Sequence, residues 1–219
     1  SGANWPDQAY GTGPYMVKEW KRGQSIELAA NPNYWQGTPG VPKILMPFTK
    51  DSETAYQLYQ TGELDIQGSG QNPVPAAHIP DVQSLPDFKS AAQLTTRYIG
   101  FNTEKSPFDN PDVRRAFALA TDKATLANQV LVGSVVPADR ILPTGLVGTQ
   151  LPIKPLAYSP DDAKAALATA GFANGQGFPE ITLAYGQEGD NETVVQALQS
   201  MWEQNLGLKV KLQSFELAT

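Results

Sequence analysis

The segment from Thr96 to Lys123 constrains the fold of this 219-residue chain more than any other part of the sequence. Residues 96–102 alternate in the manner of a short strand of mixed character, and a polar loop follows. Asn110 then precedes Pro111 and Asp112, which is the usual order of a helix N-cap, a first-position proline and a first-turn carboxylate. The segment therefore predicts a strand followed closely by a capped helix.

Strand and helix patterns also alternate on both sides of this segment. Strands are predicted over residues 15–20, 25–31, 44–48, 64–66, 89–94, 181–185 and 208–212. Helices are predicted to begin near residues 51, 111, 123, 160 and 191. The expected N-caps of the first four are Asp51 or Ser52, Asn110, Asp122 and Ser159. The pattern indicates a mixed α/β fold, in which residues 44–48 and 64–66 form a parallel strand, helix, strand unit.

Composition and charge limit the classes of function. The net charge is −6, and this acidic balance argues against general binding of nucleic acid or of an anionic membrane surface. The chain has no cysteine, which excludes disulfides, thiolate catalysis and cysteine zinc sites. No apolar run is long enough to span a membrane, so we expect no membrane span in this chain.

The loop from Gln67 to Asn72 is the first candidate for ligand contacts. It follows the predicted strand at residues 64–66, and α/β folds place ligands at the carboxyl ends of strands. Its glycines let a ligand approach the backbone closely. The side chains that supply hydrogen-bond donors and acceptors suited to a peptide backbone are Gln67, Ser69, Gln71 and Asn72.

Tyr98 and Asn102 are the second candidate. A tyrosine on a connecting strand and an asparagine at its end can offer ring stacking and amide hydrogen bonds to an extended ligand. A core role for Tyr98 and a capping role for Asn102 explain the same residues equally well. The sequence leaves the two interpretations open.

The remaining polar groups are explained without catalysis. His78 is the only histidine, and a metal site around it would need several carboxylates. The triplet at residues 68–70 lacks the spacing of a nucleophile elbow, and no phosphate-binding loop occurs. Arg114 and Arg115 could grip a carboxylate, but a solvated helix face is the commoner outcome. We therefore predict no catalytic residue, no metal site and no cofactor.

Several motifs resemble one known family in both content and order. The run from Tyr98 to Gly133 is similar to the family 5 extracellular solute-binding proteins of dipeptide and oligopeptide ABC transporters. Lys123 stands where that family usually has arginine. The residues of this run that match are Tyr98, Phe101, Asn102, Pro107, Phe108, Asp112, Val113, Arg114, Ala116, Ala120, Asp122 and Gly133. Further matches are GTGPY at 11–15, NPNYW at 31–35, TGELDI at 61–66, SPDDAKAALATAGF at 159–172 and WEQNLGLKV at 202–210.

The resemblance implies a periplasmic-binding-protein-like (type II) fold, with two α/β lobes joined by crossover strands and closing over a solute. Residues 1–97 would belong to the first lobe, and residues 98–219 would supply a crossover strand and the first half of the second lobe. The implied partners are a peptide or other small solute and the membrane permease of an ABC importer. The implied location is periplasmic or extracellular, with a lipid anchor as one option for the full-length protein.

The resemblance also implies that this chain is a fragment, because the family's proteins are longer at both ends. Two alternatives to solute binding stay open. One is a hydrolase built on a similar sheet, which would need a nucleophile and base or a metal centre. The other is a docking or scaffold lobe that binds no ligand.

Overall fold

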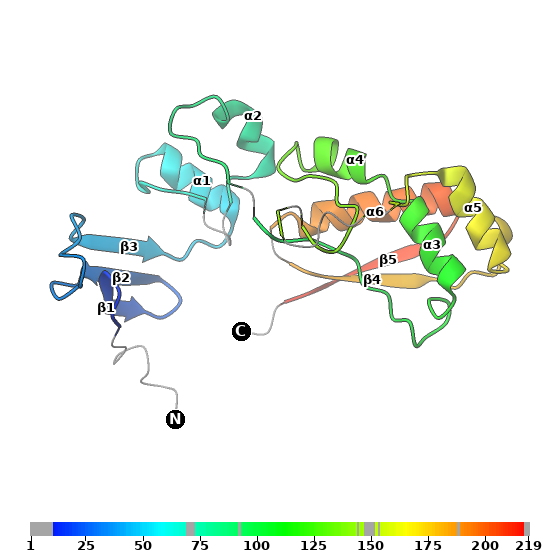
Figure 1. Cartoon of the computed structure of the whole chain (residues 1–219), viewed down its shortest axis with the longest axis horizontal. Coiled ribbons are helices and arrows are strands. Elements are labelled where there is room, and N and C mark those ends of the chain that lie inside the picture. Colours follow the sequence, from blue (N-terminus) through cyan, green and yellow to red (C-terminus); the bar gives the residue numbers. More distant parts are fainter. Residues whose placement is uncertain are drawn as a thin grey trace. The chain divides into compact units, whose positions relative to one another are not determined.

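The computed structural model describes residues 11–68, 73–91, 93–143, 145–146, 152, 154–187 and 189–216. The chain divides into two compact units, Ser1–Ile66 and Gln67–Thr219. Figure 1 shows their elements in sequence order, from blue to red. The boundary predicted at residues 97 and 98 concerns the lobes of a larger protein, so the assignment of 1–97 and 98–219 to two lobes stays a prediction.

The first unit contains a three-stranded antiparallel sheet in the order β1-β2-β3 (Figure 1). The strands are β1 (Tyr15–Lys21), β2 (Ser25–Ala30) and β3 (Lys43–Pro47). The predicted hairpin is confirmed, with Trp20 opposite Ile26 and Val17 opposite Leu28. The alternating apolar residues Ile26 and Leu28 lie in the central strand, where they have neighbours on both sides.

Helix α1 (Ser52–Gln60) follows the sheet and is capped as predicted, because Asp51 Oδ1 accepts a hydrogen bond of 2.7 Å from the Thr54 amide. The predicted parallel unit after it is wrong. Residues 64–66 form no strand, and β3 pairs antiparallel with β2. The amides of Glu63 and Leu64 donate to the Leu58 carbonyl at 2.8 and 3.1 Å. These amides complete the end of the helix and are thus not available for a strand ladder.

The described part of the second unit is built from helices and one pair of strands. Its helices are η2 (Ala76–His78), α2 (Ile79–Val82), α3 (Pro111–Leu119), α4 (Lys123–Thr125), η3 (Leu126–Val130), α5 (Pro160–Thr169), η4 (Ala173–Gly175) and α6 (Asn191–Leu206). Its strands are β4 (Ile181–Gly186) and β5 (Val210–Phe215). The two strands are parallel, with Ile181 opposite Val210, and α6 connects them. Figure 1 shows α6 running alongside the strand pair, with α3 and α5 next to each other.

Three helix starts in this unit are capped by the residues that the sequence predicted. Asn110 Oδ1 accepts from the Asp112 amide at 2.8 Å, and Asp122 Oδ1 accepts from the Thr125 amide at 3.0 Å. Ser159 Oγ accepts from the Asp162 amide at 3.3 Å and donates to the Asp162 carboxylate at 2.8 Å. These short polar side chains satisfy amides that have no partner inside the helix.

The core of the second unit surrounds Phe117, whose side chain is almost completely buried. Its ring meets those of Phe108 and Trp202 at centroid distances of 5.3 and 4.9 Å. The Trp202 indole N–H donates to Thr121 Oγ1 at 2.9 Å, and this hydroxyl donates to the Phe117 carbonyl at 2.7 Å. The buried members of the cluster are Val113, Ala116, Phe117, Leu119, Ala120, Ala163, Leu167, Leu198, Trp202, Leu206, Leu208 and Val210.

The strand predicted over residues 96–102 is not formed, and neither is the one predicted over 89–94 in the described residues there. A strand needs a partner ladder, and β4 and β5 pair only with each other among the described strands of this unit. Phe101 nevertheless holds the end of the segment in place, because its ring stacks on Phe108 at 4.8 Å. The mixed α/β class is confirmed. No helix in the described part of the chain combines the length and the apolar character needed to cross a membrane.

Candidate ligand-binding site

Tyr98 lies in an exposed segment that leads to the core aromatic residue Phe101. Its side chain is 73% exposed, and Arg97 beside it is also exposed. Phe101 packs inward three residues later. Tyr98 therefore takes no part in the core of this unit, and its ring is accessible to a ligand.

Asn102 has a structural role at the start of the loop before α3. Its Oδ1 atom accepts a hydrogen bond of 3.2 Å from the Glu104 amide, and its carbonyl accepts from the Lys105 amide at 3.3 Å. This is the arrangement of an asparagine that stabilises a turn. The capping role that the sequence left open is thus present, and a ligand contact would have to use the rest of the side chain.

Gln67 begins the other candidate loop. Its Nε2 atom donates to the Pro73 carbonyl at 3.2 Å, which closes the loop across its base. Gly68 follows with φ of 117°, a conformation that favours glycine. The other predicted contacts in this loop, Ser69, Gln71 and Asn72, lie outside the described residues.

The two candidate segments are not shown to form a single site. The hydrogen bonds given above join Gln67 and Asn102 to neighbours within six residues, and Tyr98 projects outward. Contrary to the prediction, Gln67 does not follow the carboxyl end of a strand, since residues 64–66 are not a strand. What supports Tyr98 and Asn102 is their exposure, together with the position of Tyr98 near the anchored Phe101, and what supports Gln67 is its polar side chain.

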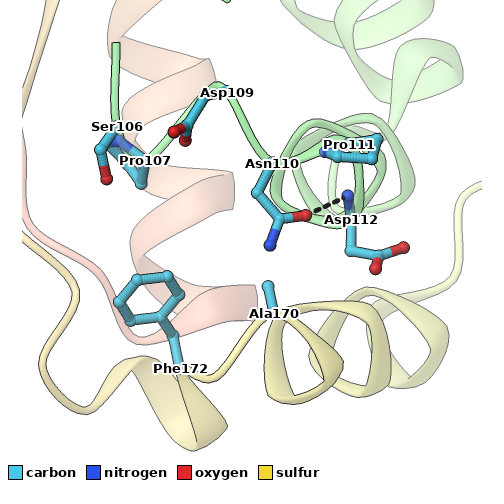
Figure 2. A pocket seen from close by; sticks show the side chains of 8 residues that line it. All are labelled: Ser106, Pro107, Asp109, Asn110, Pro111, Asp112, Ala170 and Phe172. Carbon is cyan, nitrogen blue, oxygen red and sulfur yellow. Dashed lines mark hydrogen bonds between the residues drawn. The ribbon is translucent and has the colours of Figure 1, made fainter.

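A hollow of about 520 Å³ lies elsewhere in the second unit, between the start of α3 and the end of α5. Figure 2 shows its lining side chains, with Asn110 on one side and Phe172 across from it. The lining residues are Ser106, Pro107, Asp109, Asn110, Pro111, Asp112, Ala170 and Phe172. The sequence predicted none of them as ligand contacts.

Two polar groups of the hollow, Asn110 Oδ1 and the Asp112 amide, build the helix start. Asn110 caps α3, as the dashed line in Figure 2 shows. Arg114 donates to the carbonyls of Phe108 and Asp109 at 2.6 and 3.1 Å, so it fixes the preceding turn rather than lying on a solvated face or gripping a ligand carboxylate. The described residues contain no group of three or more His, Cys, Asp or Glu side chains that could hold a metal ion. The hollow is thus part of the framework of the unit.

The resolved pKa shifts belong to structural groups as well. Hydrogen bonds from the Thr54 and Thr125 amides lower the pKa values of Asp51 and Asp122, which are helix caps. The hydrogen bond between Lys18 and Glu27 raises the lysine pKa and lowers the glutamate pKa. These shifts mark sites of stabilisation and not a catalytic pair.

Comparison with known proteins identifies the family, which the local geometry does not. Residues 1–219 match the family model described as bacterial extracellular solute-binding proteins, family 5 Middle. The chain is 30% identical to the oligopeptide-binding protein OppA of Bacillus subtilis over 97% of this chain and 40% of that protein. It is 32% identical to the heme-binding protein A of Haemophilus influenzae over 75% of this chain and 30% of that protein.

A solved structure also resembles the chain. The periplasmic oligopeptide-binding protein OppAIV of Borrelia burgdorferi superposes with a TM-score of 0.85 at 28% identity, over 99% of this chain and 43% of that one. The type II periplasmic-binding-protein fold is therefore confirmed for this part of the protein. The chain spans about 40% of the length of these relatives.

Proposed function

Because this chain belongs to the family 5 bacterial extracellular solute-binding proteins, we propose that it binds a small solute outside the cytoplasm for an ABC importer. The observation that carries this proposal is the family match over all 219 residues. The fold agrees with it, since the likeness to an oligopeptide-binding protein extends over 99% of the chain. The proposed binding partners of the protein are the solute and the membrane permease that receives it.

A di- or oligopeptide is the proposed solute. The relative named for oligopeptide binding matches 97% of this chain, and the relative named for heme binding matches 75%. The side chains Gln67, Ser69, Gln71 and Asn72 carry the amide and hydroxyl groups that a peptide backbone pairs with. Heme is the second candidate, because one of the two relatives is named for it.

The proposed contacts within this chain are the loop from Gln67 to Asn72 together with Tyr98 and Asn102. Tyr98 supports the proposal best, since a tyrosine that is 73% exposed offers a large apolar face and a hydroxyl at low entropic cost. The Gln67 side chain ties the start of this segment to Pro73, because its Nε2 atom donates to the Pro73 carbonyl. The glycine at 68 lets the backbone approach a ligand.

In this proposal the protein binds its solute without changing it chemically. The relatives named above are binding proteins, and neither is described as a hydrolase. The protein would act in the periplasm or at the cell exterior, as its family does. A lipid anchor on the full-length protein stays a prediction.

Calorimetric titration of the full-length protein with a library of short peptides tests this function. Mass spectrometry of the peptides after each titration shows whether they remain intact. Saturable binding of intact peptides is the expected result, and a parallel titration with heme, followed by its absorbance, is the arm for the second solute. Hydrolysed peptides would show the enzyme alternative, and failure of both ligands to bind would contradict both proposed solutes.

A further inference from the structure

The turn at the end of α5 contains the only Asn-Gly pair in the sequence, Asn174–Gly175. Asn174 is exposed to solvent within η4. An asparagine followed by glycine is the dipeptide most prone to deamidation, because glycine has no side chain to shield its amide nitrogen. We propose that Asn174 is a latent deamidation site that the folded turn keeps unreactive and that local opening of the turn activates.

The reaction uses only groups of this chain and water. The Gly175 nitrogen attacks Asn174 Cγ, a C–N bond forms, and the side-chain nitrogen leaves as ammonia, which takes up the amide proton. The resulting succinimide ring is opened by one water molecule, at either carbonyl. The products are aspartate or isoaspartate at position 174, and each adds a negative charge.

The backbone conformation of the turn opposes the first step. Asn174 has φ of 54° and ψ of 28°, in the left-handed region. At this ψ the Gly175 nitrogen points away from the Asn174 side chain, so ring closure requires a large rotation about the Cα–C bond. The Gly175 amide also donates to the Phe172 carbonyl at 2.9 Å, and this hydrogen bond must break first.

Packing against the end of α6 prevents that rotation. A Cβ atom on Gly175 would lie 2.6 Å from the Gly207 carbonyl oxygen and 2.9 Å from that of Leu206, so the turn and the helix end are in direct backbone contact. A Cβ atom on Gly207 would in turn lie 3.1 Å from the Asn174 carbonyl oxygen. The Phe172 and Phe178 rings, 5.0 Å apart, flank the turn.

Deamidation at Asn174 would therefore record that the turn has opened, and it would prevent the turn from closing again. Isoaspartate inserts an extra carbon into the backbone between residues 174 and 175. The close contact between Gly175 and Gly207 leaves no space for this carbon, so a modified molecule cannot restore the packing of the turn on α6. Molecules that have opened once would accumulate with a looser end of α6.

The test compares rates of deamidation at mildly alkaline pH by mass spectrometric peptide mapping. The samples are the folded chain, the chain in denaturant, and a synthetic peptide with the sequence of residues 170–179. A fourth sample is Gly207→Ala, which crowds the Asn174 carbonyl and leaves the Asn-Gly pair intact. Its matched control is Gly133→Ala, which places alanine at a similar φ of 73° in open space outside the turn.

We expect Asn174 in the folded chain to react more slowly than in the peptide by about tenfold or more, because reaction requires local opening. Denaturant should remove this protection, and Gly207→Ala should reduce it more than Gly133→Ala does. Deamidation of folded Asn174 at the rate of the free peptide would overturn the proposal. Equal acceleration in the two alanine variants would show that global unfolding, and not opening of this turn, controls the reaction.

Discussion

At the scale of single residues, the helix caps are the positions where sequence and structure correspond most directly. Asn110, Asp122 and Ser159 each place an oxygen on an amide two or three residues later. Such contacts lie within one turn of the chain, so the local sequence is sufficient to predict them. One of these caps also makes stability depend on pH.

The cap Asp122 predicts a stability difference that disappears in acid. The hydrogen bond from the Thr125 amide lowers the pKa of the carboxyl in the folded protein below its ordinary value of 3.8. Its contribution is therefore complete above that value and is lost as pH falls through the lower, folded pKa. Asp122→Ala should cost about 1 kcal/mol at neutral pH and clearly less near pH 3.

Urea denaturation at the two pH values measures this difference. Asp122→Ser is the matched control, because serine keeps a capping oxygen but does not titrate in this range. Its stability relative to Asp122→Ala should be the same at both pH values. An equal loss for Asp122→Ala at neutral and acid pH would contradict the assigned cause.

At the scale of elements, local patterns predicted the longer helices well, whereas the predicted strands formed only where the described part of the chain supplies a partner strand. The hairpin of β1 and β2 and the helix α6 were predicted within a few residues of their observed bounds. Residues 96–102 have the pattern of a strand but no partner among the described strands of their unit. Residues 63–64 use their amides to complete α1. Periodicity shows that a segment can be a strand, whereas pairing depends on residues far away in the sequence.

The contact between η4 and α6 provides a prediction at this scale. Gly175→Ala introduces a Cβ 2.6 Å from the Gly207 carbonyl oxygen at φ of 74°. Gly177 is the matched control, because it has nearly the same φ of 72° and nothing within 4 Å of its ideal Cβ. Both substitutions should cost about 1–2 kcal/mol for the left-handed backbone.

Only Gly175→Ala should add a steric cost, of about 1–3 kcal/mol, because backbone atoms of α6 have to move. The free energy of unfolding of the two variants, from denaturant titration, measures the difference. Equal losses at positions 175 and 177 would mean that the close approach of η4 to α6 does not exist in solution.

At the scale of the whole molecule, the described part of the chain exposes many large apolar side chains. In the first unit Val17 and Met46 lie on one face of the sheet, and Met16 and Leu45 lie on the other. Leu45 is 55% exposed on β3, which has a neighbour only on one side among the described strands. Exposed apolar edge strands tend to pair with other chains.

We therefore expect the isolated 219-residue chain to associate in solution as its concentration rises. Light scattering across a concentration series measures this, together with binding of a dye that reports exposed apolar surface. Leu45→Lys should weaken association without loss of stability, because it places a charge on an exposed position of an edge strand. A sharp monomer at high concentration with no dye binding would contradict the prediction.

The sequence could predict the family and the type of fold, but only part of a binding site. The family motifs are local runs of residues, and the match over residues 1–219 agrees with them. A site between lobes depends on residues distant in sequence, and this chain spans about 40% of its relatives. Asn102 illustrates the difficulty, since the same asparagine suits a turn and a ligand, and the structure shows the turn.

The measurement that tests the account most directly is the effect of Tyr98→Ala in the full-length protein, with solute affinity and melting temperature determined on the same samples. The exposed ring predicts a loss of affinity of about 1–3 kcal/mol, the usual effect of removing a well-packed aromatic anchor. The melting temperature should change little. Tyr158→Ala, another partly exposed tyrosine outside the proposed contacts, should leave affinity unchanged. Unchanged affinity and a lowered melting temperature for Tyr98→Ala would instead show that Tyr98 is a core residue of the complete protein, and the proposed contact would be wrong.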